Sequence, residues 1–138
     1  MFVTVLNYEG QMLQHSRPTI DAEDIKAVTQ VLQSGYIAQG LLVEEFENRF
    51  RKFLGVEWAV ATNSGSSALH LSLLALGVGR GDEVILPSYV CVAVLNAVRY
   101  VGAEAKLCDI CEGDLNLRVR DIKKEINKRT RAIILTHT

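Results

Sequence analysis

One small polar turn contains residue types that can bind a phosphate: Ser64, Gly65, Ser66 and Ser67. Residues 57–62 before it predict a strand, and residues 67–76 after it predict a leucine-rich helix. The first N–H groups of a helix have no partner within the helix and lie at the positive end of its dipole. A phosphate can accept hydrogen bonds from them, Gly65 lets the backbone come close, and the serine hydroxyls can donate more. The turn is therefore a candidate phosphate site. The alternative is an ordinary turn with serine caps.

The elements around this turn alternate between strand and helix. Further strands are expected at 83–87, 105–109 and 132–136, with helices at 90–100 and 119–127 between them. This order predicts an α/β fold with a parallel sheet and right-handed crossovers, in which ligands bind at the carboxyl ends of the strands. Polar segments predicted to lie on that edge are the turns 64–67, 88–91 and 109–111, together with His137.

Two amphipathic helices are expected ahead of the sheet, at 21–34 and 41–54, and the charged residues of the second form a solvated face. The loop between them, residues 35–40, has a glycine at each end and contains Tyr36 and Gln39. From the residues alone it is either a linker with one packed aromatic side chain or a functional loop. Residues 1–16 show no sustained period and are expected to form an N-terminal arm.

Composition excludes several classes of protein. The chain has 138 residues, 49% of them hydrophobic, and its net charge is −1 without a basic block, so neither disorder nor nucleic-acid binding is expected. The longest uncharged run, 84–98, has 15 residues and is too short to cross a membrane. The N-terminus lacks the pattern of a signal peptide.

The three cysteines, Cys91, Cys108 and Cys111, are an odd number, which favours a reducing cytoplasm. Cys108 and Cys111 have the spacing of a redox or zinc motif. No second Cys/His pair stands at ligand spacing, so no metal site is predicted.

In several segments the sequence resembles the DegT/DnrJ/EryC1/StrS family of pyridoxal-phosphate (PLP) sugar aminotransferases. The match runs in order from about Arg17 to the last residue. The segments that carry it are Arg17-Pro18, 34–40 (SGYIAQG), 43–47 (VEEFE), 63–70 (NSGSSALH), 79–89 (GRGDEVILPSY), 100–103 (YVGA) and 129–134 (RTRAII).

The resemblance implies the N-terminal part of the large domain of a fold-type I PLP-dependent transferase, with three α/β/α layers. Residues 17–138 would form this incomplete domain. The implied activity is transfer of an amino group from an amino acid such as glutamate to a nucleotide-linked keto-sugar. The implied protein is a cytoplasmic homodimer without nucleic-acid or membrane partners.

The resemblance also implies site residues. Gly65, Ser66 and Ser67 would hold the cofactor phosphate, largely through backbone N–H groups, and Tyr36 would lie near the substrate. Cys91 stands where the family has an aromatic residue against the cofactor ring, and a thiol gives a smaller contact.

The family's Schiff-base lysine and its pyridine-pairing acid fall after the position where this chain ends. No catalytic residue is therefore nominated, and the chain alone is expected to be inactive. Two alternatives stay open at this point: a truncated, inactive product, and a Rossmann-like or flavodoxin-like phosphate-binding protein without PLP.

Overall fold

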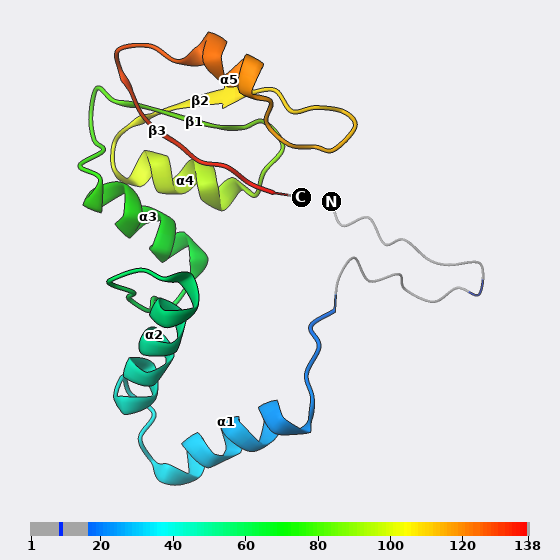
Figure 1. Cartoon of the computed structure of the whole chain (residues 1–138), viewed down its shortest axis with the longest axis vertical. Coiled ribbons are helices and arrows are strands. Elements are labelled where there is room, and N and C mark those ends of the chain that lie inside the picture. The colour runs from blue at the N-terminus through cyan, green and yellow to red at the C-terminus, as the bar shows by residue number, and fades with distance from the viewer. Residues whose placement is uncertain (1–8, 10–16, 138) are drawn as a thin grey trace. The chain divides into compact units, whose positions relative to one another are not determined.

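A computed structural model of the chain describes Glu9 and residues 17–137. They belong to two compact units, Met1–Phe53 and Leu54–Thr138, which are described separately (Figure 1). The assignment of residues 17–138 to one incomplete domain stays a prediction. The expected arm at 1–16 lies outside the described residues, apart from Glu9.

The first unit holds α1 (Ala22–Ser34) and α2 (Leu41–Leu54), the latter ending one residue into the second unit. Asp21 caps α1 by accepting hydrogen bonds from the N–H groups of Glu23 and Asp24, and Asp24 accepts one from the N–H of Asp21. Gly35 ends the helix at a φ of 73°, a left-handed conformation that favours glycine. Both helices were predicted, α2 with the same bounds.

The second unit is built on a parallel sheet of three strands in the order β2-β1-β3. The strands are β1 (Glu83–Pro87), β2 (Glu104–Cys108) and β3 (Thr130–Ile133). Their connections contain α4 (Val92–Tyr100) and α5 (Val119–Glu125), and α3 (Gly65–Ala75) precedes β1. This confirms the predicted α/β fold with parallel strands. Most boundaries differ from the predictions by one to three residues, as helix ends commonly do.

The central strand β1 is buried along its whole length, because helices cover both faces of the sheet. Val84 and Leu86 pack into one cluster with α4, while Ile85 packs on the other face with Cys108 and Ile122. Figure 1 shows α4 and α5 on opposite sides of the strands. Since successive side chains of a strand point to opposite faces, the Val-Ile-Leu run serves both layers. The three-layer arrangement is thus present in this unit.

Two sequence predictions are wrong in this unit. Residues 57–62 form no strand, because an isolated segment gains no ladder of hydrogen bonds without a neighbouring strand, and none of the described strands pairs with it. The helix α3 is less buried than its composition suggested. It packs on α4 and buries Leu73, whereas Leu71 and Leu74 remain about half exposed.

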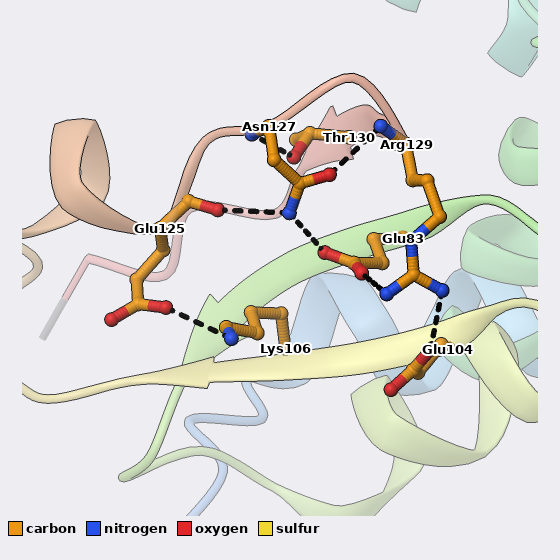
Figure 2. A network of polar contacts seen from close by, with 7 residues as sticks. All are labelled: Glu83, Glu104, Lys106, Glu125, Asn127, Arg129 and Thr130. Atoms are coloured by element: carbon orange, nitrogen blue, oxygen red, sulfur yellow. Dashed lines mark hydrogen bonds and ion pairs between the residues drawn. The ribbon is translucent and has the colours of Figure 1, made fainter.

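The edge at which the strands begin carries a network of polar side chains (Figure 2). Glu83, only 2% exposed, forms an ion pair with Arg129 and accepts a 2.7 Å hydrogen bond from the Asn127 amide. Arg129 also bonds Glu104 at 3.1 Å. A buried carboxylate is costly unless it is paired and hydrogen-bonded, and here it is both. The network therefore fixes the start of all three strands.

Within the part of the chain that the structure describes, no helix has both the length and the apolar composition required to span a bilayer.

Candidate functional site

The predicted phosphate turn lies at the start of α3. Ser64 precedes the helix in an extended conformation, with φ −162° and ψ 156°, and its hydroxyl accepts a 3.1 Å hydrogen bond from the Ser67 N–H. Its carbonyl accepts bonds from the Ala68 N–H at 3.1 Å and from the Thr62 hydroxyl at 2.9 Å. Ser64 is thus a well-anchored N-cap. It begins the helix two residues earlier than the sequence pattern suggested.

Side chains also bond to one another within this turn. The Ser67 hydroxyl donates to the Oδ1 atom of Asn63 at 2.8 Å, and the two hydroxyl oxygens of Ser64 and Ser67 are 2.9 Å apart. Sequence reasoning gave Asn63 no role of its own. The available signal was its spacing, because a short polar side chain just before an N-cap can reach forward to the first helical turn.

Two backbone donors stay uncovered at this helix start. Among the described residues, no acceptor bonds the N–H of Gly65 or of Ser66. Gly65 and Ser66 are both exposed, so solvent reaches this helix start. Both N–H groups lie at the positive end of the α3 dipole, with the Ser66 hydroxyl beside them. This set of donors fits a phosphate, which only accepts hydrogen bonds when fully ionised.

The loop after β1 contributes the second part of the candidate site. The Ser88 N–H donates to the carbonyl of Cys108 at 2.9 Å, which joins the ends of β1 and β2. Tyr89 is 61% exposed, and Cys91 is exposed immediately before α4, where it makes no capping hydrogen bond. Asp109 follows directly after β2 and is also exposed. The structure therefore brings the predicted turns 88–91 and 109–111 to the same edge.

The turn of α3 lies on the same side of the unit. Helices α3 and α4 pack on each other, and both run from the side where the strands end towards the side where they begin (Figure 1). The Ser64 turn and the Cys91 loop therefore both face the carboxyl edge of the sheet. That is where ligands bind in parallel α/β units.

The two cysteines of the Cys-x-x-Cys motif differ from Cys91. Cys108 is buried, and burial, followed by the nearby carboxylates of Asp121, Glu125 and Asp109, raises the pKa of its thiol. A raised thiol pKa leaves less of the reactive thiolate at neutral pH. No group of three potential metal ligands gathers among the described residues.

Tyr36 belongs to the first unit and is not among the residues that the second unit brings together. It is 84% exposed and lines a hollow formed by Val31 and residues 34–43. The hollow is mostly apolar, with the two glycines of the loop at Gly35 and Gly40. Its substrate role remains a prediction.

The model of the DegT/DnrJ/EryC1/StrS aminotransferase family matches residues 18–138 of this chain. Among solved structures, the aminotransferase TlmJ from Streptoalloteichus hindustanus is 34% identical with a TM-score of 0.81, over 89% of this chain and 34% of that one. DesV from S. venezuelae, solved in complex with a ketimine intermediate, is 38% identical with a TM-score of 0.75, over 83% of this chain and 31% of that one.

A third similar structure is the GDP-4-keto-6-deoxy-D-mannose-3-dehydratase of E. coli, solved with bound hydrated PLP. It is 29% identical with a TM-score of 0.78, over 87% of this chain and 32% of that one. The chain thus spans about a third of the length of these proteins.

Proposed function

Because this chain belongs to the DegT/DnrJ/EryC1/StrS aminotransferase family, we propose that it supplies the phosphate-holding part of a PLP-dependent sugar aminotransferase. The observation that carries the proposal is the exposed helix start at Gly65, where two backbone N–H groups and the Ser66 hydroxyl have no partner among the described residues. They match the demand of a phosphate for several donors at once. PLP, when bound, supplies an electron sink through which an amino group is moved between substrates.

The residues of this chain would orient the cofactor from two sides. Gly65 and Ser66 would hold the phosphate at the start of α3, and Ser67, whose N–H and hydroxyl bond within the turn, would support them from the same turn. Cys91, at the start of α4, would lie against the ring, with the exposed Tyr89 next to it. The small thiol leaves room there that an aromatic side chain would fill. Tyr36 would contact the sugar substrate from the loop 35–40.

The proposed substrates are a nucleotide-linked keto-sugar and an amino-acid donor such as glutamate. The sugar is supported by the E. coli relative, whose name specifies a GDP-linked keto-sugar. We further propose a cytoplasmic homodimer that takes part in amino-sugar or polysaccharide biosynthesis.

A second candidate activity comes from the same relative. The E. coli protein is a dehydratase that binds PLP, so a similar fold also serves the removal of water from a keto-sugar. Conversion of a keto-sugar by the full-length protein with glutamate present distinguishes the two. An amino-sugar formed together with an equal amount of 2-oxoglutarate supports the transferase, and a deoxysugar without an amino group supports the dehydratase.

Ser67→Asp in the full-length protein tests the phosphate site. The new carboxylate would repel the phosphate, and PLP affinity should fall at least about tenfold, on the order of 1.4 kcal/mol. Ser72→Asp is the matched control, since Ser72 lies further along α3 and its hydroxyl bonds the Ala68 carbonyl. Equilibrium dialysis measures both affinities. Equal affinities in the two variants would refute the site.

A further inference from the structure

The hydrogen-bond chain in front of α3 has a defined direction. Ser67 Oγ lies 2.8 Å from Asn63 Oδ1, and an amide oxygen only accepts, so the single hydroxyl proton of Ser67 points at Asn63. Ser64 Oγ lies 2.9 Å from Ser67 Oγ. Since the Ser67 proton is already used, Ser64 must be the donor of that second bond.

The hydroxyl protons of Ser64 and Ser67 are therefore both donated to acceptors within the turn. Ser64 Oγ still accepts the Ser67 N–H at 3.1 Å, so the cap of the helix is kept. The chain of bonds begins at the Ser67 N–H, passes through the two hydroxyls and ends at Asn63. The groups at the helix start that have no partner among the described residues are the N–H of Gly65, the N–H of Ser66 and the Ser66 hydroxyl.

We propose that Asn63 is a positioning residue of the phosphate site, acting through the Ser67 hydroxyl. The proposal rests on the proposed function, because it concerns the same cofactor phosphate. Asn63 accepts the last proton of the chain and so holds the first turn of α3 in the arrangement that exposes the Gly65 and Ser66 donors. A site held in place before binding loses less conformational freedom when the ligand arrives.

A double-mutant cycle on the full-length protein tests this role, using PLP and pyridoxal as ligands. Asn63→Leu and Ser67→Ala should each lower PLP affinity about fivefold, the size expected for one neutral hydrogen bond. The double variant should lose no more than Ser67→Ala alone, because both changes break the bond from Ser67 to Asn63 and Ser67→Ala also removes the acceptor of the Ser64 hydroxyl. Pyridoxal has no phosphate, so its affinity should stay unchanged. Ser72→Ala, which removes another hydroxyl from α3, should affect neither ligand.

Three results would overturn the role of Asn63: losses that add in the double variant, equal losses for pyridoxal, or single variants that bind PLP normally. If the leucine impairs folding, Asn63→Ala completes the same cycle. Ser67→Asp separates the two proposals. If it weakens PLP binding while the cycle shows no coupling, Asn63 alone is misassigned and the phosphate site stands. If it changes nothing, both proposals fail.

Discussion

The two edges of the parallel sheet differ in whether their polar groups are bonded within the unit. At the edge where the strands begin, Glu83 is buried and bonded by Arg129 and Asn127, and the partners come from within the unit (Figure 2). At the edge where they end, Gly65 and Ser66 leave donors uncovered and Cys91 is exposed. Polar groups that satisfy one another stabilise the fold. Donors left open at a helix start are available to a ligand.

This difference predicts that substitutions at the first edge change stability and leave cofactor binding intact. Arg129→Ala should lower the free energy of unfolding by about 3 kcal/mol, because a buried carboxylate loses its charged partner and keeps only Asn127. Urea unfolding of the full-length protein measures the change. PLP affinity of the folded variant should equal that of the wild type.

Arg131→Ala is the matched control for this change. Arg131 pairs with Asp82 at 3.2 Å, but the Asp82 side chain is 21% exposed against 3% for Glu83, so removing Arg131 should cost less than about 1 kcal/mol. Equal losses in the two arginine variants would show that burial of Glu83 contributes nothing special to this edge.

Replacing Cys108 or Cys91 by phenylalanine tests the same difference between a buried position and the open edge, with a smaller expected change in stability. Cys108→Phe forces a ring into the core beside Ile85 and should cost roughly 1–3 kcal/mol, or more if the strands shift. Cys91→Phe places the same ring on the open edge, where stability should stay unchanged and PLP should bind more tightly through contact between rings. Thermal unfolding and PLP titration measure both. Loss of folding in Cys91→Phe would identify Cys91 as a core residue and its assignment to the cofactor as an error.

Sequence patterns predicted the elements whose stability is local or whose burial is complete. The bounds of β1 followed from its continuous apolar run, and those of α2 from its helical period and glycine stop. The apolar run within 57–62 predicts a strand for the same reason as β1. Its state, however, depends on a neighbouring strand that a local pattern does not contain.

The location of the candidate site could be predicted from the sequence, but the hydrogen bonds within it could not. Serines and a glycine between an apolar run and a helix indicate a helix start, and the alternation of elements assigns it to the carboxyl edge. The bond from Ser67 to Asn63 depends on rotamers in the turn, which residue types do not specify. The sequence pattern did not predict the burial of Glu83 either, because its partner Arg129 lies far along the chain.

The most direct test of the phosphate site is a crystal structure of the full-length protein with PLP bound. We expect phosphate oxygens within about 2.7–3.2 Å of the Gly65 and Ser66 backbone nitrogens, the normal range for such hydrogen bonds. We also expect the Cys91 side chain to lie against the ring. A phosphate bound at another segment, with the start of α3 in contact with solvent alone, would contradict the assignment.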